Sequence, residues 1–334
     1  MSAKFESFDL GLHANEILRN AIQEKYETTK LSKASLASML NIALGTLYKK
    51  LNGDSEFSLG EALFLCKELG IDFSHLTDQT STKIVIDLPH LGSGVKSIME
   101  YLENLEKLLL LAGRQKDLSI WYVTHELPIF YYFTDTNLGL FKLYTYARSV
   151  WEIDRFDYNT PYDPSAFDPE VIGKMKKLWS MYANLNTIEI WNTAILDNTY
   201  NQLMTVKDFA LYTNEEDLQL ILDGFKQVIS KIENMIYSQS KNGTAENIRI
   251  YLNSMVFTNN IILLKSELLN LLITVHDNPN FFTSTDTRFL RRTKQWIDKL
   301  IKQSNCLTDS QATLGASFIR NIKDQWERFA VKLA

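Results

Sequence analysis

The stretch LSKASLASMLNIALGTLYKKLNG, Leu31–Gly53, decides the fold of the first part of this chain. Its first half has apolar residues at helical spacing after Ser32, a residue type that caps helices by accepting a backbone N–H hydrogen bond. Asn41 follows, a residue that tolerates a positive φ, and a second helical segment then runs to Gly53, which is suited to ending it. The pattern predicts two short helices joined by a tight turn.

Further helices are predicted on both sides of this stretch. Apolar residues recur at helical spacing from Leu10 to about Tyr26, and Ser58 can cap a later helix, LGEALFLCKELG. The sequence therefore predicts a first domain of about five short helices in residues 1–76.

A larger, mostly helical domain is predicted at residues 95–334, after a linker at residues 77–94 that contains TDQTSTK, a candidate short strand (KIVIDLP) and the loop LGSG. Residues 247–285 differ, because they are rich in Ile, Val, Leu and Tyr. They fit a small antiparallel β element or a buried helix at Asn260–Val275, and periodicity does not separate the two. The expected fold class is mainly α, close to all-α. The helical segments are Val95–Gly113, Leu138–Trp151, Pro169–Ala183, Thr187–Met204, Glu215–Tyr237, Thr287–Ser304 and Ser310–Val331.

The composition suits a globular chain and argues against several classes of protein. The chain has 334 residues, of which 45% are hydrophobic, enough for the cores of two or three domains. Its formal charge of −5 argues against a general electrostatic attraction to nucleic acid. Two distant cysteines suit a reducing compartment, no apolar signal segment is visible, and the apolar run Leu108–Ala112 is too short to cross a bilayer. We expect a cytoplasmic protein without a membrane partner.

The two central helices meet the demands of a helix-turn-helix, in which one helix braces a second that enters the DNA major groove. Ala37 is the small residue that lets the helices cross closely, Asn41 is the turn residue, and Leu47 locks the second helix to the core. The segment Lys33–Asn52 resembles, without a gap, the Cro/repressor type of helix-turn-helix, the XRE family of regulators. The resemblance extends over roughly Leu10–Leu76. The other expected core positions are Leu36, Leu40 and Ile42.

The resemblance implies roles for side chains on the outer face of the second helix and beside it. Five positions would face base edges: Ala43, Leu44, Gly45, Tyr48 and Lys49. Three would meet backbone phosphates: Lys33, Lys50 and Asn52.

The residue types at the base-facing positions are unusual for a DNA reader. Ala43 has no side-chain oxygen to cap the second helix, a loss of about 1 kcal/mol relative to Ser or Thr. Leu44 and Gly45 cannot make the bidentate hydrogen bonds that each discriminate between bases by about 1–3 kcal/mol. Lys49 can still reach a guanine, Tyr48 remains beside it, and Leu44 or Ala43 can contact a thymine methyl.

The charge balance of residues 1–76 also departs from the basic balance usual in DNA-binding domains. Eight basic side chains stand against ten acidic ones, although Lys30 and three of the lysines named above lie in or beside the motif. The order Lys50-Leu51 reverses the family pattern, so we expect Leu51 to pack and Lys50 to turn outward toward phosphate. Either specificity comes largely from DNA shape and dimer spacing, or the helix does not read DNA.

No motif in the sequence predicts a metal, cofactor or catalytic site. HELPI at His125–Ile129 lacks the second histidine of a zinc-protease helix and is interrupted by Pro128, so a capped turn is expected. Asp277–Arg288 lacks the mid-loop glycine and final glutamate of a calcium loop. Phosphate-binding glycine fingerprints and a GxSxG nucleophile elbow are also missing from the sequence. We therefore predict that the chain is not an enzyme; an enzyme would need a polar cleft in the second domain.

Two segments of the second domain each leave two interpretations open. Arg288–Lys302 predicts a basic helix with Trp296 and Ile297 on its apolar side, and its basic face is either solvated or a surface for phosphate or a partner. The aromatic residues concentrated in Trp121–Tyr158 form either core or an apolar pocket for a small ligand. HELPIFYYF and LFKLYTYARSVW within it, and Glu189–Trp191, resemble the long second region of some bacterial one-chain regulators.

The sequence therefore predicts a DNA-binding transcriptional regulator that reads the major groove with the helix at residues 43–51. Its expected partners are double-stranded DNA and a second copy of itself, with a small molecule or protein as effector at the second domain. The alternative is an adaptor whose helix-turn-helix surface meets another protein instead of DNA. The acidic balance of the first domain motivates this alternative.

Overall fold

The computed structural model divides the chain into two compact units, Met1–Val85 and Ile86–Ala334, and each is described by itself. None of the described helices in either unit is long and apolar enough to cross a bilayer. The structure describes residues 10–29, 32–69, 71, 84, 86–88, 95–151, 153, 155–255, 259–276, 279–309 and 313–333.

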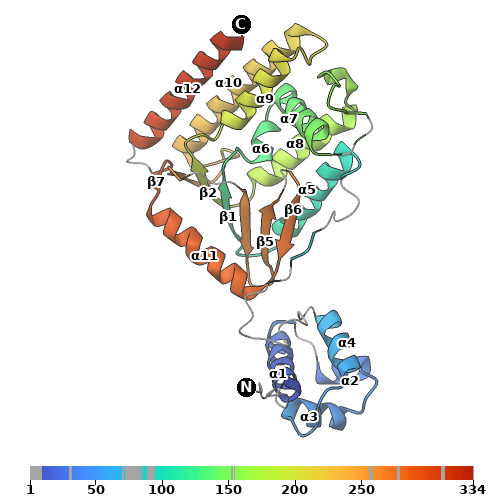
Figure 1. The fold of residues 1–334 in the computed structure, drawn as a ribbon. Helices are drawn as coiled ribbons and strands as arrows, with labels where there is room; N and C mark the ends of the chain where they lie inside the picture. The colour runs from blue at the N-terminus through green and yellow to red at the C-terminus, as the bar shows by residue number, and fades with distance from the viewer. Residues whose placement is uncertain are drawn as a thin grey trace, which may run out of the picture. The chain divides into compact units, whose positions relative to one another are not determined.

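The first unit is a small helical bundle around its own apolar core (Figure 1). Its described residues contain four helices, where about five were predicted: α1 (Leu10–Thr29), α2 (Lys33–Met39), α3 (Leu44–Asn52) and α4 (Leu59–Leu69). Helices α1, α2 and α4 each contribute two or more buried apolar residues to this core, and α3 contributes Leu47. The buried members of the core are Ile17, Leu18, Ile22, Leu36, Ala37, Leu47, Phe57, Ala62, Leu65, Cys66 and Ile71.

Most of the predicted linker at residues 77–94 lies outside the described residues, including TDQTSTK and the loop LGSG, as does Lys30. Of the candidate strand KIVIDLP, Asp87 forms an isolated antiparallel bridge with Thr283 in the second unit. The two residues exchange backbone hydrogen bonds of 2.8 Å in both directions.

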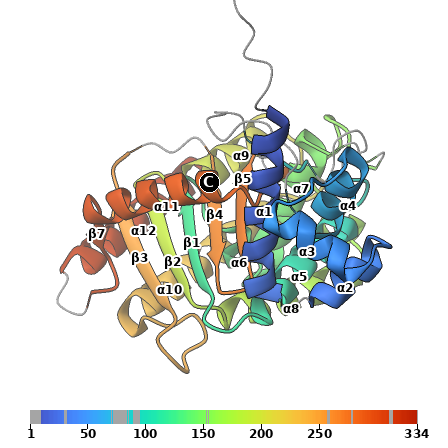
Figure 2. The ribbon, with the colours of Figure 1, turned by 90° about the horizontal axis from the view of Figure 1, so that it is seen from below.

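The second unit is an α/β fold, so the prediction of a mainly α chain is wrong. It contains a seven-stranded mixed sheet with the strand order β6-β5-β4-β1-β2-β3-β7. Strand β2 pairs in parallel with β1 and with β3, and the other pairs of neighbouring strands are antiparallel. The middle strands lie side by side in this order in Figure 2. The strands are β1 (Ser119–Thr124), β2 (Thr187–Asn192), β3 (Ile248–Asn253), β4 (Ile261–Lys265), β5 (Asn270–Val275), β6 (Phe281–Ser284) and β7 (Asn305–Cys306).

Helices cover the two faces of the sheet unequally (Figure 1). Of the described helices, α11 (Thr287–Lys302) alone packs on one face, through Leu290, Ile297 and Leu300 against Val123 and other strand residues. The other face meets a thick helical layer that contains most of the buried apolar side chains. That layer consists of α5 (Ile98–Gly113), α6 (Ile129–Tyr132), α7 (Thr136–Ser149), α8 (Pro169–Ala183), α9 (Asp197–Asp208), α10 (Glu215–Ser238) and α12 (Thr313–Leu333).

The predicted helices of the second unit are mostly confirmed within a few residues, but two expectations in this unit are wrong. The segment predicted as one helix at Thr187–Met204 is strand β2 followed by α9, because TIEIWN pairs with β1 and β3. The buried helix considered at Asn260–Val275 is instead β4 and β5. Strands were the other interpretation of residues 247–285, and these residues do form strands. They do not make a separate small antiparallel element, because they belong to the seven-stranded sheet and β3 pairs in parallel with β2.

Candidate nucleic-acid interface

The predicted turn between α2 and α3 is confirmed by its backbone geometry. Ser32 caps α2, because its Oγ accepts a hydrogen bond of 3.0 Å from the Ser35 N–H. Asn41 has a φ of 53°, the left-handed conformation expected of the turn residue. Gly53 ends α3 with a φ of 85°, where a side chain would be strained. The chain therefore enters and leaves α3 as the sequence pattern requires.

The inner face of α3 is locked to the core by one residue. Leu47 is fully buried and packs in the same cluster as Leu36 and Ala37 of α2. Leu40, Ile42 and Leu51 are partly buried against this cluster, so the prediction that Leu51 packs is confirmed. Because α3 is held along this one side, its other side is left free of the bundle.

The outer face of α3 presents the residues that the family resemblance assigns to base edges. Leu44 and Tyr48 are each 43% exposed. Ala43, Gly45 and Lys49 are also exposed. Lys33 of α2 reaches the same surface, where its Nζ lies 5.0 Å from the centre of the Tyr48 ring. Asn52, at the end of α3, is exposed as well. The structure thus brings seven of the eight predicted site residues to one exposed surface of α2 and α3.

Lys50 is the exception, and the prediction that it turns outward is wrong. Its side chain is only 12% exposed, and its Nζ lies 2.9 Å from Glu61 Oε2 and 2.6 Å from the Glu56 carbonyl oxygen. Burial tends to raise the pKa of Glu61, but the Ser58 N–H and the Lys50 ammonium together hold it below its ordinary value. The Lys50–Glu61 pair therefore joins α3 to the start of α4 and leaves Lys50 already paired.

The start of α3 lacks a side-chain cap, as the sequence predicts. Ala43 is the N-cap, with φ −66° and ψ 145°, and no side chain caps the exposed N–H groups. We expect Ala43→Ser to raise the free energy of unfolding of the first unit by about 1 kcal/mol, because the hydroxyl can accept one of these N–H bonds. Hydrogen exchange of residues 44–52 in the full chain measures the change. Ala43→Val, which adds bulk without an oxygen, is the control, and equal protection in both variants would contradict the explanation.

The second unit contains a buried ion pair that sequence reasoning missed. Lys142 of α7 is fully buried and pairs with Glu126, which follows β1 in the HELPI segment. Lys142 Nζ also donates to Gln202 Oε1 at 2.7 Å, and Asn198 Nδ2 donates to Glu126 Oε2 at 2.9 Å. Burial tends to raise the pKa of Glu126, but Lys142 and Asn198 hold it below its ordinary value. The expected capped turn at HELPI is therefore an anchor for a buried polar cluster.

A second buried carboxylate, Glu189 of β2, is enclosed by hydrogen-bond donors. Tyr182 donates to its Oε1 at 2.6 Å, and Trp191 Nε1 donates to its Oε2 at 2.9 Å. The Tyr131 hydroxyl lies 3.0 Å from both carboxylate oxygens. Nearby, Lys241 Nζ donates a hydrogen bond to the Thr187 hydroxyl oxygen at 2.7 Å, and burial lowers the pKa of Lys241 to about 8. Glu189 therefore links α6, α8 and β2 through buried hydrogen bonds.

The basic helix α11 has the apolar side that the sequence predicts. Ile297 is buried against the sheet, and Trp296 is partly buried in the same cluster. Arg288 pairs with Asp286 at 2.8 Å, and Lys294 lies over the ring of Trp121, with its Nζ 4.6 Å from the ring centre. These contacts fit the interpretation of a solvated basic face that is partly neutralised locally.

Compared with models of protein families, with curated proteins and with solved structures, the chain matches none of them.

Proposed function

We propose that the chain is a sequence-specific, DNA-binding transcriptional regulator that reads the major groove with α3. The observation that carries the proposal is the division of α3 into two faces. Leu47 is buried in the core, while Tyr48 and Lys49, the next residues along the helix, are exposed beside Lys33. A helix held on one side and bare on the other is what groove entry requires.

Direct readout by this surface is sparse and depends mainly on Lys49. Its ammonium can donate to guanine O6 and N7, while Ala43 and Leu44 can contact a thymine methyl. Gly45 has open space where a side chain would lie, so the α3 backbone can come close to the bases. Lys33 and Asn52 meet phosphates, whereas Lys50 stays with Glu61. Much of the specificity then comes from DNA shape and from the spacing of two half-sites.

The second unit supplies dimerisation and effector sensing in this proposal, without catalysis or a cofactor. A homodimer places two copies of α3 about 34 Å apart, on successive turns of one face of DNA. An effector, a small molecule or a protein, acts by favouring one dimer geometry over another. The regulator works in the cytoplasm.

Selection of genomic fragments in vitro, followed by competition titrations at stated salt, tests the proposal. Lys33→Ala is expected to weaken binding to all duplexes alike and to reduce the slope of log K against log salt by about 1. Lys49→Ala is expected to lose about 1–3 kcal/mol at a single base position. Lys67→Ala, an exposed lysine on α4, is the matched control and should change neither quantity. Identical affinity for every duplex would overturn the proposal.

The alternative is an adaptor that uses the same surface to bind a protein. The exposure of Leu44 and Tyr48, together with the acidic balance of residues 1–76, favours it, since apolar side chains form the centre of protein interfaces. It predicts a partner whose capture is lost in Tyr48→Asp, and no retardation of any genomic DNA fragment.

A further inference from the structure

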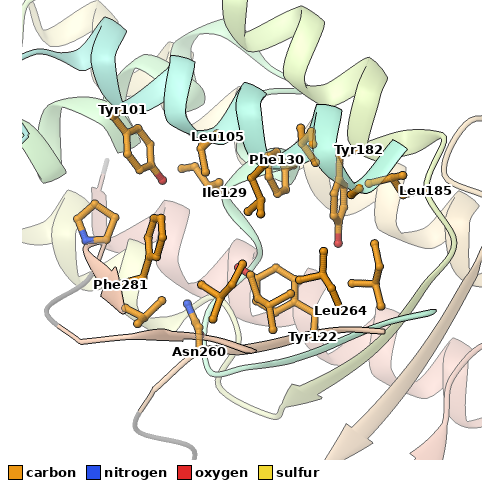
Figure 3. A pocket seen from close by; sticks show the side chains of 18 of the residues that line it. Tyr101, Leu105, Tyr122, Ile129, Phe130, Tyr182, Leu185, Asn260, Leu264 and Phe281 are labelled. Atoms are coloured by element: carbon orange, nitrogen blue, oxygen red, sulfur yellow. The ribbon is translucent and has the colours of Figure 1, made fainter. Parts of the chain in front are cut away.

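An apolar cavity of about 80 Å³ lies in the second unit, between helices α5 and α8 and the sheet (Figure 3). Strands β1, β4 and β5 form its floor, and Phe281 of β6 closes one side. Most of the side chains around it are aliphatic or aromatic, among them Leu105, Ile129, Phe130 and Leu264. The cavity is therefore a preformed space in which an apolar molecule would replace contacts that the protein lacks.

Five side chains with polar atoms line this wall, and each is more than nine-tenths buried: Tyr101, Tyr122, Tyr146, Tyr182 and Asn260. The Tyr182 hydroxyl is committed to Glu189, to which it donates at 2.6 Å. The Asn260 Oδ1 is committed, because it accepts from the Thr124 hydroxyl at 2.7 Å and from the His125 N–H at 3.2 Å. Its amide nitrogen points into the cavity, and the Tyr101 hydroxyl points across the cavity toward the sheet (Figure 3). Among the described residues, the hydroxyls of Tyr101 and Tyr122 and the amide nitrogen of Asn260 make no hydrogen bond.

The unused polar groups are neutral hydrogen-bond donors. Burial and the nearby carboxylates of Glu126 and Glu189 raise the pKa of Tyr122 above its ordinary value, and burial, Tyr122 and Glu126 do the same for Tyr101. Their O–H groups therefore stay protonated. Among the described residues that line the cavity there is no lysine or arginine, so a buried anion would meet negative potential without compensation from them. An uncharged acceptor, such as a carbonyl oxygen, satisfies the donors without that cost.

We propose that this cavity binds a small, uncharged, mostly apolar molecule that carries one carbonyl-type oxygen, placed against Asn260, Tyr101 and Tyr122. An engineered apolar cavity of about 150 Å³ holds benzene, which has six non-hydrogen atoms, so a cavity about half as large fits a ligand of about three or four non-hydrogen atoms. The binding site does not depend on DNA binding; its role as the effector site rests on the proposed function.

Acetone is the probe, because it combines two methyl groups with one carbonyl oxygen. Ligand-observed saturation-transfer NMR on the full chain measures its affinity, with isobutene and acetate, which have the same shape, as comparators. We expect acetone to bind about three- to tenfold more tightly than isobutene, the gain of a buried hydrogen bond, and acetate not to bind. Equal affinities for the ketone and the hydrocarbon, or no saturation transfer to either, would overturn the site.

Hydroxyl deletions locate the binding. Tyr101→Phe and Tyr122→Phe are expected to weaken acetone binding severalfold and to leave isobutene binding unchanged, since each removes a donor but keeps the ring. Tyr200→Phe is the matched control, because the Tyr200 hydroxyl is also buried without a partner among the described residues and lies outside this cavity. Ala112→Leu fills the cavity and should abolish binding of both probes, with unchanged circular dichroism as the check on folding.

The two proposals fail in distinguishable ways. If DNA fragments are retarded but acetone does not bind, the cavity assignment falls and the regulator stands. If acetone binds and no fragment is retarded, the binding site stands and its role as an effector site on a DNA reader falls.

Discussion

Lys142→Met is expected to lower the free energy of unfolding of the second unit by about 3–5 kcal/mol. The variant removes the cation and leaves the Glu126 carboxylate buried, with exposure of only 1% for the residue. Asn198 and the hydroxyls of Thr199 and Tyr132, which also donate to Glu126, are neutral. A buried charge that loses its partner retains its desolvation penalty, which is why removing one member costs more than the pair contributes.

Urea unfolding followed by tryptophan fluorescence measures this loss, since all six tryptophans lie in the second unit. Lys176→Met, an exposed lysine on α8, is the matched control and should change stability by no more than about 0.5 kcal/mol. Adding Glu126→Gln to Lys142→Met removes the buried carboxylate charge and should restore most of the loss. A Lys142→Met variant as stable as the wild type would show that the Lys142–Glu126 pair does not stabilise the fold.

The first unit could be largely predicted from the sequence because its structure depends on neighbours in the chain. The positive φ of Asn41, the Ser32 cap and the helix end at Gly53 involve contacts within a few residues. Leu47 of α3 packs in one cluster with Ala37 of α2, the preceding helix in the chain. Such short-range requirements leave a readable pattern of residue types.

The sheet could not be predicted in this way, because its pairings join distant segments. Ile120 lies opposite Thr187 in β2 on one side and opposite Leu264 in β4 on the other. A short apolar run such as SIWYVT looks the same whether it becomes a buried strand or part of a core helix. In TIEIWN the helical pattern of the following α9 obscured the strand, although Thr, Ile and Trp are residues that favour strands.

The candidate site shows the same division between short-range and long-range information. The exposed face of α3 follows from its periodicity, but the fate of Lys50 depends on Glu61 in the next helix. Lys142 carried a signal that could have been read, since it is the one charged residue within the run LGLFKLYTYA. A lone lysine there predicts a buried partner without saying which acid it is.

Leu47→Ala is expected to destabilise the first unit by about 2–5 kcal/mol, because it opens a cavity where α3 is locked to the core. A small helical unit has only a few kcal/mol of stability, so most molecules would lose this fold. Hydrogen exchange with mass spectrometry on the full chain reports residues 10–71 separately from the second unit, whose own core should stay protected. In the proposed regulator, retardation of every DNA fragment is lost together with this protection.

Leu44→Ala makes the same chemical change one helical turn earlier, on the exposed face, and separates folding from recognition. With 43% of Leu44 exposed, truncation should change stability by no more than about 0.5 kcal/mol. It should nevertheless remove a preference for thymine at one position of the selected DNA, because the methyl contact is lost. If Leu44→Ala opens residues 10–71 to exchange as fully as Leu47→Ala does, α3 has no free face, and the surface proposed to enter the groove does not exist.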